Sequence, residues 1–267
     1  MTASAREIAR NPVKEKLARG EVVVSMAVRI VPGVEMVRIA KSAGFDTLYV
    51  DLEHSAFSMQ TTSQLSIMGL EAGMPVFVRV PAYSADYVSR VMDGGAMGVI
   101  APGVRSAEEA RQVVAAVKYP PLGSRGLGPN LPLMQYRIFP PSEALPAMND
   151  ATMVIVQFES AAALAAMEEI VAVPGVDLIL IGTNDMLADM GLAGQYDHPK
   201  VEDAYRRTIA CCRKHGKHVG VGGFGSRPDL VEKYVKMGGR FVSTGTDLAF
   251  LIGECGKRVK QVRDIKL

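Results

Sequence analysis

Apolar residues along this chain gather in short runs that are separated by longer amphipathic stretches. Four of the runs follow a glycine, at Gly44, Gly95, Gly175 and Gly239. A glycine at such a position is typical of a helix end in the left-handed conformation, followed by a turn into a strand. Short apolar runs bounded by turn residues are typical of buried parallel strands. The predicted strand regions, with their leading glycines, are 22–27, 44–50, 75–80, 95–100, 152–158, 175–181, 218–222 and 239–243.

The stretches between these runs predict helices. Residues 34–42 place apolar side chains at helical spacing. Ser106 and Glu109 have the spacing of a capping box, in which each side chain binds the other residue's backbone, ahead of a helix over 110–117. Further helices are predicted over 160–171, 201–215 and 228–237.

Eight strands that alternate with helices predict an α/β protein with a single (β/α)8 TIM barrel over residues 1–267. The length agrees, because such a barrel typically needs about 250 residues. An open, doubly wound sheet is the alternative. It is disfavoured because no G-x-G-x-x-G motif follows the first predicted strand.

Two segments stand apart from this alternation. Residues 118–150 are rich in proline and predict a long loop, which we expect to be functional or to lie at an interface. Near the C-terminus, residues 248–252 form an apolar segment, LAFLI. We expect this C-terminal helix to contact a neighbouring subunit; the alternative is that it packs on its own barrel as the eighth helix.

Composition narrows the class of protein. Hydrophobic residues make up 48% of the chain and charged residues 22%, which supplies a core and excludes general disorder. The formal net charge is only +2, so a nucleic-acid partner is not expected. No apolar stretch reaches the roughly 18 residues of a membrane span, and no secretory signal is visible. The cysteines, Cys211, Cys212 and Cys255, form no C-x-x-C pair, so we expect a reduced, cytoplasmic protein.

Active sites of TIM barrels lie at the C-terminal ends of the strands, so the polar residues there are the first candidates. Glu159 and Asp185 follow the fifth and sixth predicted strands, which are neighbours in a barrel. Two such carboxylates suit a hard cation, Mg²⁺ or Mn²⁺. The alternative is that each acid caps the helix that it precedes or interacts with its dipole.

Three further residues are candidates for catalysis. His54 follows the second strand, where an imidazole could act as a general base or simply be solvated. Arg79 lies in the apolar third strand and needs a partner, either an internal carboxylate or an anionic substrate oxygen. Asp93 ends a predicted helix, where an acid opposes the helix dipole, and this mild misfit suggests another duty.

The lysines argue against one mechanism. A Schiff-base aldolase needs a lysine at a strand end. Here the lysines precede the first strand or lie on helices and loops, and Lys217 lies at the opposite end of the seventh strand. A covalent imine mechanism is therefore not expected.

Short motifs in a fixed order cover nearly the whole chain after residue 20. They are YVDLEH at 49–54, VRVP at 78–81, YPPLGSRG at 119–126, QFE at 157–159 and IGTNDM at 181–186. Together they resemble the HpcH/HpaI aldolase family. The resemblance implies a metal-dependent class II pyruvate aldolase on a (β/α)8 barrel, commonly hexameric, and related to macrophomate synthase and the citrate lyase β subunit.

The resemblance also implies a role for individual residues. Glu159 and Asp185 match the ligands of the divalent metal, which would be Mg²⁺, Mn²⁺ or Co²⁺. Arg79 matches the arginine that contacts the keto oxygen and stabilises the enolate. His54 matches the proposed base, paired with an acid that matches Asp93. The residues that match the substrate-binding positions are Gln157, Gly182, Thr183 and Asn184.

Departures from the family pattern concern the aldehyde side of the site more than its chemistry. Leu52 stands where a glycine is frequent. Some members carry a tryptophan after the first strand, but this chain has none, and Ser25, Met26, Ala27 and Arg29 occupy that region.

The sequence thus predicts an aldolase that makes and cleaves 4-hydroxy-2-oxo acids from pyruvate and an aldehyde. A second possibility is an oxaloacetate decarboxylase or a lyase of CoA esters, because these reactions use the same enolate site. A third is a catalytically silent barrel that serves as a binding or assembly subunit.

Overall fold

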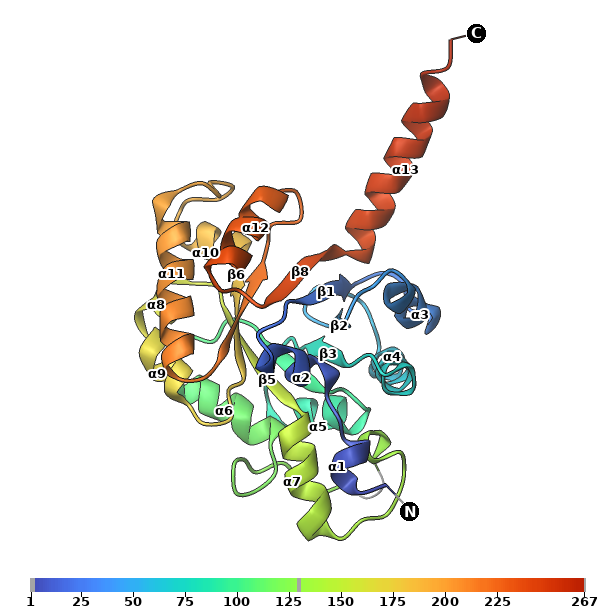
Figure 1. The fold of residues 1–267 in the computed structure, drawn as a ribbon, viewed down its shortest axis with the longest axis vertical. Coiled ribbons are helices and arrows are strands. Elements are labelled where there is room, and N and C mark those ends of the chain that lie inside the picture. The colour runs from blue at the N-terminus through green and yellow to red at the C-terminus, as the bar shows by residue number, and fades with distance from the viewer. Residues whose placement is uncertain (1–2, 129–130, 267) are drawn as a thin grey trace.

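The computed structural model describes residues 3–128 and 131–266, and in it a closed barrel of parallel strands forms the centre of the molecule (Figure 1). The strands are β1 (Val23–Val28), β2 (Thr47–Asp51), β3 (Val76–Arg79), β4 (Gly98–Ala101), β5 (Met153–Phe158), β6 (Leu178–Gly182), β7 (His218–Gly222) and β8 (Phe241–Thr246). Each strand pairs in parallel with the next, and β8 pairs with β1. The predicted TIM barrel is therefore confirmed.

Helices follow the strands along the chain and surround most of the barrel (Figure 1). They are α1 (Ala5–Ile8), α2 (Pro12–Ala18), α3 (Glu35–Ser42), α4 (Met59–Ala72), α5 (Ala85–Asp93), α6 (Ala107–Val117), α7 (Pro141–Ala151), α8 (Ala161–Ala165), α9 (Met167–Ala172), α10 (Thr183–Asp189), α11 (Pro199–Lys214), α12 (Pro228–Met237) and α13 (Asp247–Arg263), with a 3₁₀ turn, η1 (Pro132–Met134).

Most of the predicted helices are found within one or two residues of their expected ends. The helix predicted over 160–171 is divided at Ala166 into α8 and α9. Only half of the expected capping box forms. The Ser106 side chain accepts a hydrogen bond from the Glu109 N–H, but the Glu109 carboxylate accepts one from the Arg105 N–H.

The alternation of side chains along the strands places charged groups inside the barrel mouth. On β3, Phe77 belongs to the inner core, whereas Val76 and Val78 belong to the core between strands and helices. Successive side chains of a strand point to opposite faces, so Arg79 points inward at the C-terminal end. The register pairs it with Asp51, which points inward at the end of β2. Strand periodicity thus brings both residues to the same interior layer.

The segment 118–150 is not one long loop, as the sequence suggested. It includes η1 and most of α7, and its apolar residues join the inner core beneath the barrel. Helix α1 contacts both η1 and α7 there. The N-terminal end of the barrel is therefore closed by this segment together with α1 and α2. The apolar residues of the cluster that come from these pieces include Ala5, Ala9, Val13, Leu17, Tyr119, Leu133, Met134, Ala147 and Met148.

A buried lysine ties this closing segment to the barrel. The ammonium of Lys118 donates to the carbonyl oxygens of Asn149 at 2.8 Å and Thr152 at 2.6 Å. It lies 3.7 Å from a carboxylate oxygen of Asp177. Burial lowers the pKa of Lys118 to about 8, although the charge of Asp177 opposes this shift. Lys118 thus links the start of the segment to its end.

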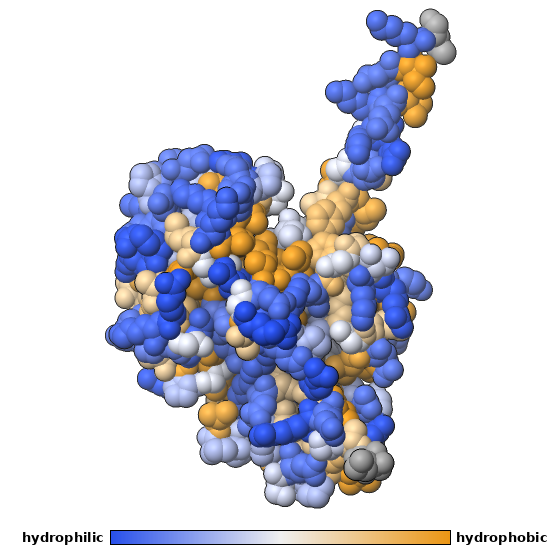
Figure 2. All heavy atoms as spheres, viewed as in Figure 1, coloured by the Kyte–Doolittle hydropathy of each residue, from blue (hydrophilic) through white to orange (hydrophobic). Residues whose placement is uncertain are grey.

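Helix α13 does not pack on its own barrel as an eighth helix. It projects away from the barrel, and Asp247 is its only buried residue among those that the structure describes (Figure 1). Phe250 and Leu251 remain 42% and 48% exposed near its base, and Ile252 is 64% exposed. Figure 2 shows apolar residues at the base of α13 and on the adjoining face of the barrel. None of the described helices is both long enough and apolar enough to span a membrane.

We expect Lys118→Met to destabilise the protein by about 2 kcal/mol or more, because it leaves two buried carbonyl oxygens without a donor. Denaturant unfolding followed by circular dichroism measures the change. Lys233→Met is the matched control, because Lys233 forms a surface ion pair with Glu202 that is worth less than about 1 kcal/mol. An equal loss in both variants would contradict the role given to Lys118.

Candidate active site

A cavity of about 230 Å³ lies at the C-terminal mouth of the barrel. Residues from seven of the eight strands or their following loops line it, with β4 as the exception. Of the residues that the sequence singled out, it contains Arg79, Gln157, Gly182, Thr183, Asn184 and Asp185. The structure therefore brings Arg79 and Asp185, one of the two predicted metal ligands, into one chamber.

Asp51 and Arg79 form a buried two-point ion pair in this chamber. The guanidinium donates through Nε to Oδ1 at 2.9 Å and through Nη2 to Oδ2 at 2.7 Å. Its remaining nitrogen, Nη1, lies 3.1 Å from Oε2 of Glu53. Burial alone would raise the pKa of Asp51, but the hydrogen bonds and charge of Arg79, aided by Arg29, outweigh it and lower that pKa. Arg79 is therefore charged and fixed in one orientation.

Asp51 also holds a second arginine. Its Oδ2 accepts a hydrogen bond of 2.6 Å from Nε of Arg29, which follows β1. The two arginines of the chamber thus share one carboxylate that is itself inaccessible to solvent. Sequence reasoning did not include Asp51 and Arg29 in the site, although each follows a predicted strand. The signal that could have found them is a charge at the end of a strand that is otherwise apolar.

Glu159 follows β5 and lies beside Gly182 of the chamber wall, although it is not itself one of the lining residues. Its Oε2 accepts a hydrogen bond of 2.9 Å from the N–H of Gly103. Burial raises the pKa of Glu159 to about 7, and the negative charges of Glu53 and Asp185 add to this shift. The hydrogen bond from Gly103 and the charge of Arg79 oppose it. A carboxylate that is buried near other carboxylates is stabilised by a bound cation. The residues present therefore fit a divalent metal ion.

Gly182 makes room beside this carboxylate. A Cβ atom at Gly182 would lie 2.9 Å from Oε1 of Glu159 and 2.8 Å from Nε2 of Gln157. Only glycine allows these two side chains to approach the end of β6 so closely. The open space lies next to Asp185, the second predicted metal ligand, on α10.

The remaining predicted substrate-binding residues differ in what they offer. Oε1 of Gln157 is buried and has no hydrogen-bond partner among the described residues, so it can accept a bond from a ligand. The hydroxyl of Thr183 donates to the carbonyl oxygen of Gly222 at 2.7 Å, inside the protein. Thr183 can therefore offer only its backbone. Oδ1 of Asn184 accepts a hydrogen bond of 2.7 Å from Tyr196.

His54 and Asp93 are not brought together within one chain. His54 is exposed at the rim, with Nε2 3.8 Å from the carboxylate of Glu53. Asp93 ends α5, which runs back from the barrel mouth, so it lies near the opposite end of the barrel. There its Oδ1 pairs at 2.5 Å with Nη2 of Arg125 in the closing segment. The pairing of these two residues suggested by the sequence therefore has no support within a single subunit.

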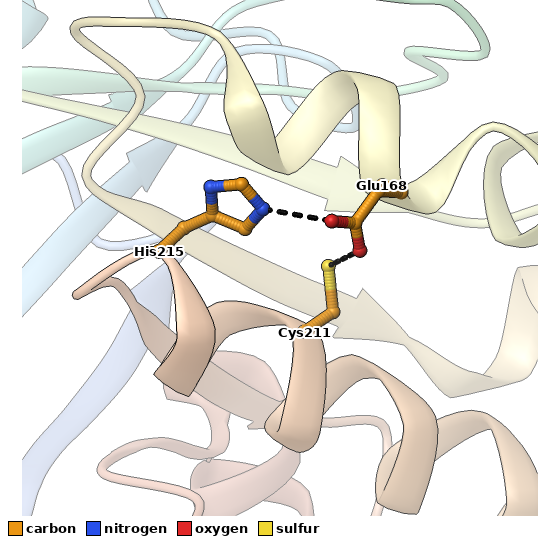
Figure 3. A group of neighbouring side chains, drawn as sticks. All are labelled: Glu168, Cys211 and His215. Carbon is orange, nitrogen blue, oxygen red and sulfur yellow. Dashed lines mark hydrogen bonds and ion pairs between the residues drawn. The ribbon is translucent and has the colours of Figure 1, made fainter.

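A second cluster of side chains that could bind a metal lies on the outer helices, away from the barrel mouth. Glu168 of α9 contacts Nε2 of His215 at 3.0 Å and Sγ of Cys211 at 3.3 Å, and both of these partners belong to the end of α11 (Figure 3). The ammonium of Lys214 also binds this carboxylate. Burial raises the pKa of Cys211 to about 11, and the hydrogen bond to Glu168 adds to the shift. The group links two helices away from the barrel mouth and is distinct from the Glu159 site.

Comparisons with known proteins place relatives along nearly the whole chain. The model of the HpcH/HpaI aldolase/citrate lyase family matches residues 4–253. A 4-hydroxy-4-methyl-2-oxoglutarate aldolase of Hapsidospora irregularis is 34% identical over 259 residues, which cover 95% of this chain and 96% of the relative. The 2-keto-3-deoxy-L-rhamnonate aldolase of Escherichia coli (strain K12) is 34% identical over 238 residues, 89% of this chain and 87% of the relative. The crystal structure of an HpcH/HpaI aldolase from Desulfitobacterium hafniense DCB-2 matches with a TM-score of 0.87 at 32% identity, covering 95% and 97% of the two chains.

We expect Asp51→Asn to cost about 3–5 kcal/mol of stability, because it leaves buried guanidinium charge without its counter-charge. The loss should depend on pH. The folded-state pKa of Asp51 is lowered, so its contribution is complete above its unfolded pKa of about 3.9 and is lost as the pH falls through the folded pKa. Denaturant unfolding between pH 7 and pH 2 should show the variants converging at the acidic end. A constant difference across this range would contradict the assignment.

Proposed function

This chain belongs to the HpcH/HpaI aldolase/citrate lyase family and is a carbon–carbon lyase, and we propose that it cleaves and forms 4-hydroxy-2-oxo acids as a divalent-metal-dependent class II aldolase. The observation that carries the proposal is the fixed guanidinium of Arg79 in the same chamber as Asp185 and beside Glu159. We further propose 4-hydroxy-4-methyl-2-oxoglutarate, the substrate in the name of the fungal relative, as a substrate. Pyruvate is then both the nucleophile and the acceptor.

We propose a separate task for each residue of the site. A divalent cation held by Glu159 and Asp185, Mg²⁺, Mn²⁺ or Co²⁺, would polarise the keto group of the substrate as a Lewis acid. Arg79 is oriented by Asp51 so that it can stabilise negative charge on the C2 oxygen. Gln157 has a free acceptor for a substrate hydroxyl. The backbone of 182–184 would receive the pyruvate carboxylate.

Cleavage needs one proton to leave the C4 hydroxyl. We assign its removal to His54, at the rim of the chamber. As the O–H bond breaks, the C3–C4 bond breaks and its electron pair enters the enolate, with charge on the C2 oxygen beside Arg79. C3 then takes up a proton and pyruvate is formed. Asp93 could orient His54 only if a second copy of the chain supplied it, because within one chain it pairs with Arg125.

A homo-oligomer is also part of the proposal, and the family resemblance favours a hexamer. Residues 243–246 of β8 are only partly buried; Ser243, Gly245 and Thr246 line the chamber, and Thr244 does not. The eighth helix would cover β8 in a complete barrel, yet α13 projects away. We propose that the α13 of a second copy covers this face, which would bury Phe250 and Leu251.

Two other activities remain distinguishable by experiment. An oxaloacetate decarboxylase would use the same enolate site, and so would a lyase of CoA esters. CO₂ release from oxaloacetate, measured beside aldol cleavage, separates the first from the aldolase. A silent binding subunit would show neither reaction in the metal-loaded protein.

We expect chelation to abolish turnover and added Mg²⁺, Mn²⁺ or Co²⁺ to restore it. Glu159→Gln should weaken metal activation by more than the roughly 10–100-fold that loss of an outer-shell partner costs, because an amide is a poorer ligand for a hard cation. Glu168→Gln is the matched control, because Glu168 lies on α9 away from the barrel mouth. It should leave the metal concentration needed for half-maximal activity unchanged. Full activity of chelator-treated protein would refute the metal requirement.

Variants of Arg79 and of His54 should lose activity in different ways. Arg79→Ala should slow aldol cleavage and oxaloacetate decarboxylation alike, by about 10²–10³-fold, because both reactions develop charge on the same oxygen. Arg79→Lys should recover little, because a point charge does not reproduce the planar fork. His54→Ala should slow cleavage by about 10²–10⁴-fold and spare much of the decarboxylation, which removes no hydroxyl proton. Equal ratios of the two rates in both variants would show that the division of roles is wrong.

Light scattering tests the proposed assembly. The intact protein should give a mass several times 28.6 kDa, that of one chain. The double variant Leu251→Asp/Ile252→Asp should give a smaller species, because charges on the apolar face of α13 oppose burial. Gln261→Ala, on the same helix, should change nothing. A mass of one chain for the intact protein at micromolar concentration would reject the oligomer.

A further inference from the structure

Arg29 has hydrogen-bond donors that the protein leaves unused. Only its Nε is engaged by another side chain, at 2.6 Å from Asp51. Neither Nη1 nor Nη2 donates to any residue in the described ranges, 3–128 and 131–266. In Arg79, by contrast, all three nitrogens have carboxylate partners. The terminal edge of the Arg29 guanidinium, which can bind a carboxylate through two parallel N–H bonds, is therefore available.

The protein builds a rigid support for this arginine. The buried carboxylate of Asp247 accepts hydrogen bonds from the backbone N–H groups of Arg29 at 2.9 Å, Ile30 at 3.0 Å and Val31 at 2.9 Å. These bonds fix the turn that follows β1. Asp51 then fixes the side chain through Nε. With backbone and side chain both held, Arg29 is pre-organised, and binding a ligand costs little additional ordering.

Arg29 lies across the chamber from the metal side. In the closed barrel β1 stands between β8 and β2, and β5 is the strand farthest from it in the order. Glu159 follows β5, whereas Arg29 follows β1, and Arg29 lines the same cavity as Asp185. Next to Arg29 the wall carries the polar residues Ser243 and Thr246 of β8. A ligand bound on the metal side would therefore extend its other end toward Arg29.

We propose that Arg29 forms a second carboxylate subsite, which selects substrates with a carboxylate on C4, the acceptor carbon. Nη1 and Nη2 bind that carboxylate while the 2-oxo acid end occupies the metal side. The acceptor released on cleavage is then itself a 2-oxo acid rather than a neutral aldehyde. This inference rests on the proposed aldolase function and adds the residue that selects an acceptor with a carboxylate.

Two substrates that differ at one position test the subsite. 4-Hydroxy-4-methyl-2-oxoglutarate carries a carboxylate on C4, and 4-hydroxy-2-oxopentanoate carries a hydrogen there instead. Arg29→Met should lower kcat/KM for the first by about 10- to 150-fold, the factor for lost hydrogen bonds to a charged group, and should change the second much less. Arg29→Lys should recover part of the loss, because a lysine keeps the charge but not the fork. Arg111→Met, at an exposed arginine on α6, should change neither rate.

Comparing the two rates distinguishes a direct role of Arg29 in binding the substrate carboxylate from an indirect role in holding Asp51 and Arg79. An equal loss for both substrates would mean that Arg29 acts through Asp51 and Arg79, and it would overturn the subsite. Unchanged preference in Arg29→Met would overturn it as well. A wild-type enzyme that cleaves 4-hydroxy-2-oxopentanoate but not the dicarboxylate would refute the subsite and leave the aldolase proposal standing.

A binding measurement keeps the inference testable without turnover. Isothermal titration of the metal-loaded protein compares 2-oxoglutarate with 2-oxopentanoate, which has the same chain length and lacks the second carboxylate. The wild type should bind 2-oxoglutarate more tightly, and Arg29→Met should remove this preference. Equal binding of the two acids by the wild type, or a preference that survives in the variant, would refute the subsite even if neither aldol substrate is cleaved.

Discussion

The buried carboxylate of Asp51 is the interaction on which the chamber depends. It is inaccessible to solvent, and it binds Arg79 from the neighbouring strand and Arg29 from the strand on its other side. A buried charge is tolerated only when it is paired and hydrogen-bonded. Asp51 meets this condition with both of its oxygens, and in doing so it orients two guanidinium groups toward one cavity. Removing it would release both.

Electrostatic balance links this pair to the metal side. Four carboxylates, those of Asp51, Glu53, Glu159 and Asp185, face two guanidinium groups across the mouth of the barrel. Burial raises the pKa of Glu159, and the negative charges of Glu53 and Asp185 add to that shift. A cation bound there would stabilise the ionised form of Glu159.

The two ends and the side of the barrel serve different needs. Helix α1 and the segment 118–150 close the N-terminal end with apolar packing and the buried Lys118. The C-terminal mouth keeps a polar cavity. Helix α13 projects away from the barrel. The packing that closes one end and the polar cavity at the other are thus separate, as is usual for a TIM barrel, in which loops at the mouth vary on a constant frame.

The sequence by itself determined the barrel and its strand ends, because strand alternation and glycine-marked helix ends are local signals. Its motifs also singled out Arg79, Gln157 and residues 182–185 among those that line the mouth. The tertiary structure alone decided which charges meet. Asp51 and Arg79 are 28 positions apart, and their pairing follows from the register of β2 and β3. Likewise the partner of Asp93 proved to be Arg125, across the closing segment. Helix α7 and the outward course of α13 were also beyond sequence pattern. Each depends on packing between distant parts of the chain, which no local period encodes.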